Sequence, residues 1–346
     1  MSTSVDSPPT SRAGVEGPPA PRSGFRWRSL VWPLAVLVVT AVAVPAMNDA
    51  YYEGLAVSAL ILVTLATSWN ITGGFGGQLS FGHAAFYGVG AYTAGDVVTH
   101  LQSRGMAGVV IALLAAVLAG AVSSVLVLPG FRSQGPYFAI LTLAVAESFQ
   151  LLGQYFLPGK ANGLLVRTPF GPDDHRPFYL ALGVAAVAVA VAVVVRRTRL
   201  GIGLFAIRDD LEAAASVGVP TVRVRAAAFA VSAGVAGAAG GVYALTQIFV
   251  DPPTVFDASL SVLPVLIVTL GGTGTIAGPV LGALLWAGLN DEMSQHTANS
   301  GYTTLVYGVL LVALAILLPS GLMGLRRYLP LGRLEAVRTR LRWRRS

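Results

Sequence analysis

The most constraining feature of this sequence is a succession of apolar blocks, each long enough to cross a lipid bilayer. Crossing the hydrocarbon core takes about 20 residues of α-helix. Backbone polar groups in lipid must be hydrogen-bonded internally, so such blocks are expected to be helical. Charged residues make up 11% of the 346 residues, whereas a soluble domain carries about 25%. We therefore predict an all-α integral membrane protein with about ten membrane segments, in a range of eight to ten. The expected segments are residues 30–47, 54–73, 79–98, 106–128, 136–156, 178–195, 226–249, 260–270, 276–289 and 303–318.

Two of these segments have a second interpretation. The first block contains Ala41 and Ala43, a small-x-small pair that also occurs at signal-peptide cleavage sites. Its length and the long polar tail before it favour an uncleaved span. Residues 260–270 are short for a full span, and could form a re-entrant hairpin with the segment that follows.

Basic residues set the expected orientation, because cytoplasmic loops of membrane proteins carry an excess of Lys and Arg. The stretch 196–225 holds six arginines, and eight more lie within 326–346. Arg104 and the mixed-charge loop 157–177 lie on the opposite side and fit this pattern less well. We predict that both termini are cytoplasmic. The opposite connections that contain no Lys or Arg are 48–53, 251–257 and 291–302.

The two ends of the chain differ in composition from its middle. Residues 1–28 are rich in Pro, Ser and Gly, and are expected to form a disordered cytoplasmic tail. We expect residues 326–346 to form a basic cytoplasmic tail and residues 29–325 to form a transmembrane domain with a cytoplasmic loop at 196–225. Because the net charge of +7 lies mainly outside the apolar blocks, we read it as an orientation signal and expect no nucleic-acid partner. The chain contains no cysteine, which excludes disulfides and thiol catalysis.

Two glycine clusters interrupt otherwise apolar stretches, at residues 73–78 and 271–275. Glycine in a helix interior costs about 1 kcal/mol relative to alanine. The repeated glycines therefore predict broken or re-entrant helices. In transporters, such interruptions in two halves of the chain mark the translocation path. A plain cytoplasmic turn between two spans is the alternative, and the two interpretations are compatible.

Polar residues within or beside the apolar blocks are the candidates for lining a translocation path. Glu147 falls near the middle of its block, where an ionisable side chain is costly. It could face a pore, or it could be a hydrogen-bonded carboxyl that fixes helix packing. His83 could contact substrate, although a histidine bonded between helices is the simpler interpretation. The candidates are Asn70, Gln78, Ser80, His83, Glu147, Gly272, Thr273 and Thr275.

A polar stretch within 196–225 predicts a short helix on the cytoplasmic side. Its carboxylates lie at the expected N-terminal end, where they complement the helix dipole, and a glycine and a proline follow it. So short a helix is marginal alone, so it either connects two spans in solvent or docks into a groove of a partner. The candidate docking residues are Arg208, Asp209, Asp210, Glu212, Ala213, Ala214 and Gly218.

The sequence also bears on the source of energy. The P-loop pattern requires a lysine followed by Ser or Thr, and the single lysine, Lys160, is followed by Ala161. We therefore expect no cofactor in this chain, and ATP and Mg²⁺ bound by partner subunits if ATP drives the process. The four histidines are scattered over separate elements, so neither a metal site nor a catalytic triad is predicted, and the chain is not expected to be an enzyme.

Over residues 54–326 the sequence resembles the permease subunits of branched-chain amino-acid ABC importers, specifically the longer of the two permease types. At Ser320 the family usually has Arg. The stretches that carry the resemblance, in order along the chain, are Gly77-Gln78-Leu79-Ser80-Phe81-Gly82-His83, Gly135-Pro136-Tyr137-Phe138, Asn162-Gly163-Leu164, Ala206-Ile207-Arg208-Asp209-Asp210, Gly271-Gly272-Thr273-Gly274-Thr275 and Pro319-Ser320-Gly321-Leu322.

The resemblance implies a multi-pass protein of the bacterial inner membrane that pairs with a related second permease. It also implies two ATP-binding subunits and an extracytoplasmic solute-binding protein as partners, with residues 208–218 as the segment that docks on the ATPase. Relatives carry leucine, isoleucine and valine, while similar chains carry urea, short amides or other amino acids. The alternatives of another class are an autonomous secondary transporter or channel and an integral membrane enzyme.

Overall fold

The computed structural model describes residues 28–47, 49–101, 105–132, 135–157, 159, 162–171, 174–296, 309 and 321–325. The two expected tails, apart from Arg28, and nearly all of the expected last segment, 303–318, lie outside these residues. Within them the protein is almost entirely helical, which confirms the predicted all-α class. Two short strands, β1 (Leu164–Leu165) and β2 (Phe249–Val250), pair antiparallel.

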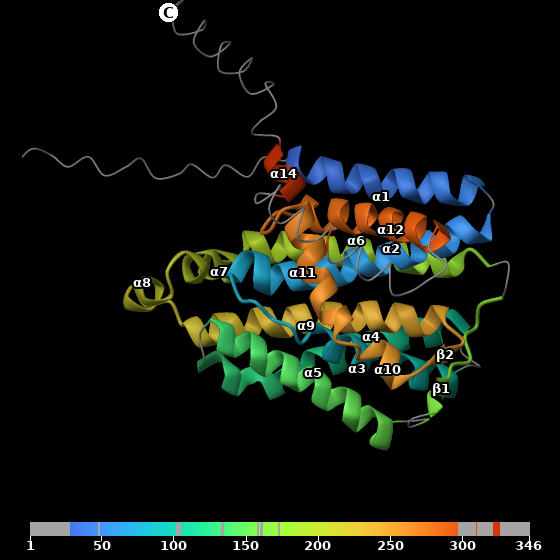
Figure 1. Cartoon of the computed structure of the whole chain (residues 1–346), viewed down its shortest axis with the longest axis horizontal. Helices are drawn as coiled ribbons and strands as arrows, with labels where there is room; N and C mark the ends of the chain where they lie inside the picture. The colour runs from blue at the N-terminus through green and yellow to red at the C-terminus, as the bar shows by residue number, and fades with distance from the viewer. Residues whose placement is uncertain are drawn as a thin grey trace, which may run out of the picture.

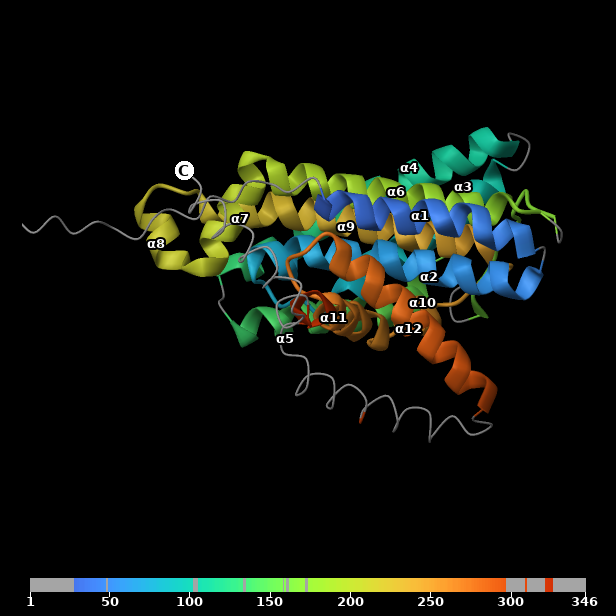
Figure 2. The same cartoon turned by 90° about the horizontal axis from the view of Figure 1, so that it is seen from above.

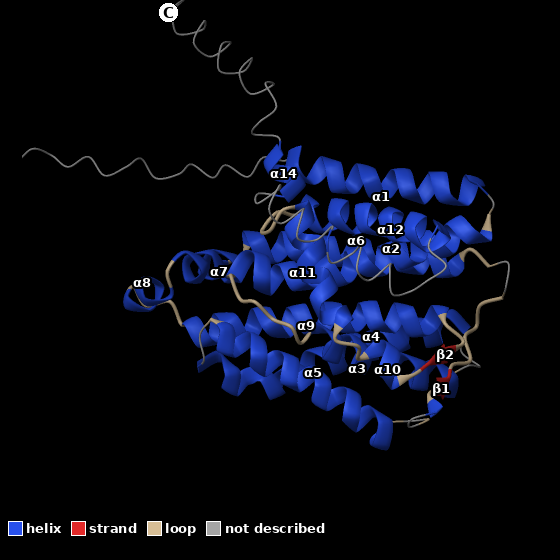
Figure 3. Cartoon of the chain, in the orientation of Figure 1, coloured by secondary structure: helices blue, strands red, loops and turns tan. Residues whose placement is uncertain are grey.

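The long helices lie side by side along the long axis of the molecule (Figure 1). Figure 3 shows how few residues of the described chain lie outside helices. The helices are α1 (Arg28–Met47), α2 (Ala50–Trp69), the π-helix η1 (Asn70–Phe75), α3 (His83–His100), α4 (Gly105–Ser123), the 3₁₀ helix η3 (Ser124–Arg132), α5 (Pro136–Phe156), α6 (Arg176–Arg197), α7 (Arg199–Asp209), α8 (Leu211–Ser216), α9 (Thr221–Thr246), α10 (Pro252–Val255), α11 (Ser259–Gly271), α12 (Ala277–His296) and α14 (Gly321–Leu325).

Six helical stretches in the described part of the chain are long and apolar enough to cross a membrane. The other expected segments up to residue 289 are helical too, in α1, α3 and α12, and the stretch that contains the short α11 reaches its length by including α10. At about 1.5 Å per residue, the 13 residues of α11 span about 20 Å, which is less than the hydrocarbon core. The six stretches are Ala50–Phe75, Gly105–Phe131, Pro136–Phe156, Arg176–Arg197, Thr221–Thr246 and Pro252–Gly271.

Helix α9 packs against α3 and α4 through small residues. A Cβ atom on Gly240 would lie 1.8 Å from the carbonyl oxygen of Tyr87, and one on Gly90 would lie 2.1 Å from that of Gly237. These backbones can approach only because both positions lack a side chain, as in small-residue packing of membrane helices. The small residues of α9 therefore allow it to pack closely against α3 and α4.

Contacts between helix ends and connecting segments gather at one end of the bundle. β1 and β2 lie there (Figure 1). His175 Nδ1 lies 2.9 Å from Glu53 Oε2, and the hydroxyl of Tyr51 donates to Asp291. The connections that meet there are those the charge pattern places together on one side of the membrane. α7 and α8 project from the opposite end, as both views show (Figures 1 and 2).

The structure corrects several expected boundaries. α3 begins at His83 rather than at Leu79, because the preceding residues form an irregular connection. The stretch 196–225 is not a loop with one short helix, since it contains α7, α8 and the start of α9. Asp209 ends α7 instead of beginning the short helix, and Asp210 alone caps α8.

Candidate functional site

The first glycine cluster breaks the chain between α2 and α3. The α-helix α2 continues as the π-helix η1, and residues 77–82 after it are irregular. Gly77 has a φ of 66°, a left-handed conformation that glycine adopts without strain. The indole Nε1 of Trp69 donates to the carbonyl oxygen of Ser80 at 2.8 Å, which holds the irregular segment against the end of α2. The predicted helix break is confirmed.

The second glycine cluster breaks the chain between α11 and α12. Gly272 and Gly274 have φ values of 122° and 73°, so this turn also requires glycine. Gly278 N donates to Thr275 Oγ1 at 2.9 Å, and that hydroxyl donates to Gly272 O at 2.8 Å. Thr275 thus caps the start of α12. Thr273, at the tip of the turn, is exposed.

Asn70 joins these two breaks. Its Nδ2 donates to the carbonyl oxygen of Thr275 at 2.7 Å, and its Oδ1 accepts from Gly274 N at 2.9 Å. The side chain is fully buried. The approach leaves no room for a side chain, since a Cβ on Gly74 would lie 2.8 Å from Gly274 N. Sequence reasoning identified Asn70 and both clusters, but not that they meet.

Arg208 links α7 to the same place. Its Nη1 donates to the carbonyl oxygen of Gly74 at 2.5 Å. Gly74 is part of η1, which has looser backbone geometry than an α-helix and is common at functional sites. The segment that projects from the bundle is therefore bonded directly to the break between α2 and α3.

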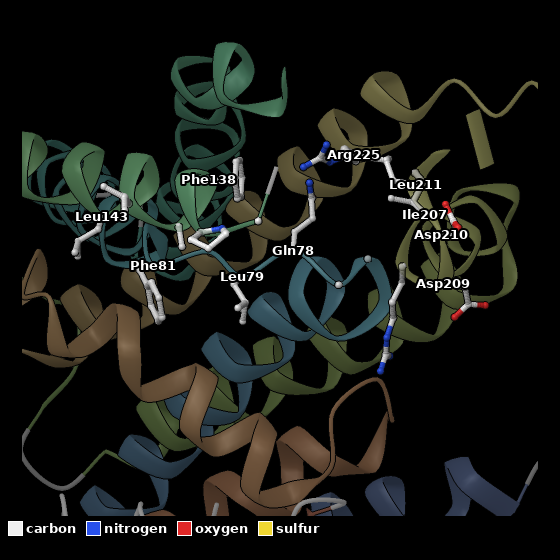
Figure 4. A pocket seen from close by; sticks show the side chains of 17 residues that line it. Gln78, Leu79, Phe81, Phe138, Leu143, Ile207, Asp209, Asp210, Leu211 and Arg225 are labelled. Atoms are coloured by element: carbon white, nitrogen blue, oxygen red, sulfur yellow. The ribbon is translucent and has the colours of Figure 1, made fainter. Parts of the chain in front are cut away.

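A cavity of about 690 Å³ lies beside the first break, at the α7–α8 end of the bundle. Figure 4 shows its lining side chains. The wall is mainly apolar and includes Leu79, Phe81 and Leu143. The polar groups on it are Gln78, Arg208, Asp209, Asp210 and Arg225. The lining residues come from 76–81, the start of α5 with Gly135, the α7–α8 junction at 207–211, and Arg225 of α9.

Arg225 is the residue of this site that sequence reasoning assigned only to orientation. It is 6% exposed. Its Nη1 donates to Phe131 O at 3.0 Å, and its guanidinium carbon lies 5.5 Å from the ring centre of Phe131 and 5.9 Å from that of Phe138. The signal that could have identified it is an arginine within the first turns of an apolar helix, where a charge must find a partner.

Gln78 covers the remaining edge of the Arg225 guanidinium. With its amide oxygen towards the arginine, Gln78 accepts hydrogen bonds from both Nε and Nη2, the latter at 2.6 Å. Figure 4 shows the two side chains pointing towards each other. Buried charges are normally paired with an opposite charge. None of the ion pairs between described residues includes Arg225.

Two other predicted pathway residues lie in the helix core. His83 is fully buried, with Nε2 2.9 Å from Ser232 Oγ, and that hydroxyl donates to Ser68 O at 2.6 Å. The imidazole therefore joins α3 to α9, and it lies against the rings of Phe86 and Phe229, which also contact each other. Ser80 is also buried. Neither residue is part of the cavity lining.

Glu147 lies on the exposed face of α5, outside the cavity. Within the described residues its carboxyl has no hydrogen bond, so the structure does not place it as a link between helices of this chain. Leu151 and Tyr155 are exposed on α5 as well. A carboxylate in the middle of a membrane-spanning helix is costly in lipid. This face of α5 is therefore suited to water or to another protein chain.

The predicted coupling segment is well formed and exposed. Asp210 Oδ1 accepts from the backbone N–H groups of Glu212 and Ala213, each at 2.9 Å, and so caps α8. Gly218, with a φ of 88°, ends it. Ala214 packs inward and is 4% exposed, while Val217 is 79% exposed. An exposed apolar tip on a short helix is a surface suited to a partner.

A bundle of long apolar helices with two interlocked breaks and a cavity at one end is the architecture of a multi-pass membrane protein. The sequence profile of the family described as "Branched-chain amino acid transport system / permease component" matches residues 51–315. The chain belongs to this family. It is accordingly a transport permease subunit and not an enzyme, as its sequence predicted.

Individual relatives agree with the profile. The chain is 29% identical over 325 residues to the high-affinity branched-chain amino acid transport system permease protein LivM of Escherichia coli K12, covering 85% of this chain and 75% of that protein. LivM of Salmonella typhimurium is 28% identical over the same shares. LivH of E. coli K12, a permease protein of the same description, is 29% identical over 119 residues, 34% of this chain and 38% of LivH. No solved structure matches the chain.

Proposed function

We propose that this chain is a transmembrane permease subunit of an ABC importer for the branched-chain amino acids leucine, isoleucine and valine in a bacterial inner membrane. The family description and the names of LivM and LivH support this substrate class. The observation that carries the mechanism is the hydrogen bond from Arg208 to Gly74. It connects the projecting α7–α8 segment to the break beside the cavity.

In this proposal α7 and α8 form the segment that docks on a separate ATPase. Arg208, Asp209, Asp210, Glu212, Ala213, Ala214 and Gly218 belong to it. Nucleotide-driven closure of two ATP-binding subunits would move the segment. The Arg208–Gly74 contact and the Asn70 bridge would carry that movement into both helix breaks. ATP and Mg²⁺ are bound by those subunits, and the permease chain itself supplies no cofactor.

The α7–α8 end of the bundle is cytoplasmic in this proposal, and the end with β1 and β2 is extracytoplasmic. The arginines of the stretch 196–225 support this orientation, because cytoplasmic loops of membrane proteins carry an excess of Lys and Arg. The ten-segment arrangement with both termini inside belongs to the same proposal. An extracytoplasmic solute-binding protein would deliver substrate at the β1–β2 end.

A second, related permease completes the translocation path. The similarity of this chain to both LivM and LivH supports a pair of related but different permeases. The exposed Glu147 on α5 favours that helix as the face turned towards the partner or towards the path between them, because lipid disfavours a carboxylate. Asn70, Gln78, Gly272, Thr273 and Thr275 would border the inner end of this path.

Two alternatives make different predictions. A related permease for urea, short amides or other amino acids would share every structural feature described above, so only transport assays separate it. An autonomous secondary transporter or channel would work without ATPases and needs a coupling-ion site or a gate of its own. The family to which the chain belongs favours the ATPase-driven system.

Positive charge introduced on α8 or at its C-cap tests the docking proposal. In Glu212→Arg and Val217→Arg, the co-expressed ATPase subunits should no longer co-purify in stoichiometric amounts, and uptake should fall by at least about tenfold. Gly218 is left unchanged, since a side chain at its φ of 88° would add backbone strain. The matched control for co-purification is Leu165→Arg, an exposed residue at the opposite end of the bundle. Normal co-purification and uptake in both α8 variants would show that the ATPase docks elsewhere.

A further inference from the structure

The guanidinium of Arg225 has one edge held by a replaceable partner. Its Nε and Nη2 atoms both donate to the single amide oxygen of Gln78. This pair of parallel N–H groups is the geometry that binds a carboxylate in a bidentate manner. A neutral amide occupies the place of an anion, and the positive charge has no carboxylate partner among the described residues.

The surroundings favour a ligand with both a carboxylate and an aliphatic part. Gln78 and Arg225 line the cavity of about 690 Å³, together with the apolar side chains of Leu79, Ile140 and Leu143. Asp209 also lines it, so a purely anionic ligand would meet negative charge as well. A zwitterion with a branched apolar side chain suits this combination of a buried cation, apolar walls and a carboxylate.

We infer that the cavity is an exit-side binding site for the transported amino acid, in which Arg225 Nε and Nη2 bind the substrate carboxylate after the Gln78 amide turns away. This inference rests on the proposed function and adds to it the residues that hold the substrate before release. Gln78 then acts as a stand-in for the carboxylate. It keeps Arg225 paired while the site is empty and returns when the substrate leaves.

Equilibrium binding of radiolabelled leucine to the permease–ATPase complex, purified without the binding protein, tests this assignment. Unlabelled leucine, its alcohol leucinol, its amide leucinamide and 4-methylpentanoate are the competitors. Leucine should compete at least about tenfold better than leucinol or leucinamide, because hydrogen bonds to a charged group contribute that much. 4-Methylpentanoate keeps the carboxylate but lacks the amino group, so it should compete less well than leucine and better than leucinol or leucinamide.

Three variants separate binding from packing. Arg225→Gln should weaken leucine binding about 10- to 100-fold and remove the preference over leucinol. Gln78→Glu supplies an internal carboxylate to Arg225 and should weaken leucine binding by at least about tenfold. Gln78→Leu leaves Arg225 in place without its amide partner and should strengthen leucine binding about two- to tenfold. The Gln78 variants keep the test informative if Arg225→Gln does not fold.

Equal competition by leucine and leucinol would overturn the inference, as would absence of saturable binding or equal effects of all three variants on both ligands. Phosphatidylglycerol added to the phosphatidylcholine used for reconstitution should not displace leucine. Displacement would assign Arg225 to a lipid phosphate instead. Uptake of leucine by the wild-type complex is measured in parallel, so failure of this site is distinguished from failure of the proposed function.

Discussion

Asn70 and Gly274 are 204 residues apart in sequence, yet the backbone N–H of Gly274 donates to the Asn70 side chain at 2.9 Å. The Nδ2 group of the Asn70 side chain in turn donates to Thr275 O. One side chain therefore satisfies a donor and an acceptor of the second helix break from within the first. A movement of either break must preserve or replace both bonds, so the two breaks are expected to move together.

Replacing Asn70 should destabilise the protein and impair transport. Asn70→Ala leaves Gly274 N and Thr275 O without their partners in a buried place, at a cost of about 1–3 kcal/mol for each group. Thermal unfolding of the solubilised complex should shift to lower temperature, and uptake should fall. Thr72→Val is the matched control, because it removes only a local bond to Trp69 O in the same helical turn. Equal stability of the two variants would contradict a bridging role for Asn70.

Arg208 should matter for coupling rather than for assembly. Arg208→Ala removes the bond to Gly74 O, so we expect ATP hydrolysis by the complex to continue while uptake per ATP hydrolysed falls several-fold. The control is Arg199→Ala, an exposed arginine at the start of the same helix. Both rates are measured in proteoliposomes. An unchanged ratio of uptake to hydrolysis in Arg208→Ala would rule out the contact as part of the coupling route.

The orientation can be measured directly because the chain contains no cysteine. Ser216→Cys on α8 and Leu165→Cys on β1 place single exposed thiols at opposite ends of the bundle. A membrane-impermeant maleimide applied to intact spheroplasts should label Leu165→Cys and not Ser216→Cys. After lysis it should label both. The reverse pattern in intact spheroplasts would invert the proposed topology.

Much of the fold was predictable because it follows from local properties of the chain. Apolar length predicted the helices, and glycine content predicted where two of them break. What the pattern did not predict is α7, because Leu200, Ile202 and Leu204 lie in a stretch whose arginines were read as marking a loop. The helix forms there nevertheless, with Gly201, Gly203, Leu204 and Ile207 buried.

The site was predicted less completely, since it depends on contacts between distant segments. Asn70, Gln78 and the two glycine clusters could be chosen by residue type. That Asn70 bridges the clusters, and that Gln78 faces Arg225, depends on how α2, α9 and α11 pack together. Arg225 was missed as a site residue because an arginine near the end of a span also serves as an orientation signal. Only its burial and its lack of a carboxylate partner in the described chain distinguish the two roles.

The central claim is that this chain carries branched-chain amino acids in an ATPase-driven complex. The direct measurement is uptake of labelled leucine into proteoliposomes that contain this permease, its partner permease and the two ATPases, with the binding protein outside and ATP inside. We predict that leucine accumulates only when ATP and the ATPases are present. Excess isoleucine or valine should suppress this accumulation, whereas urea or acetamide should not. Accumulation of urea or amides alone, or leucine uptake that persists without the ATPases, would contradict the account.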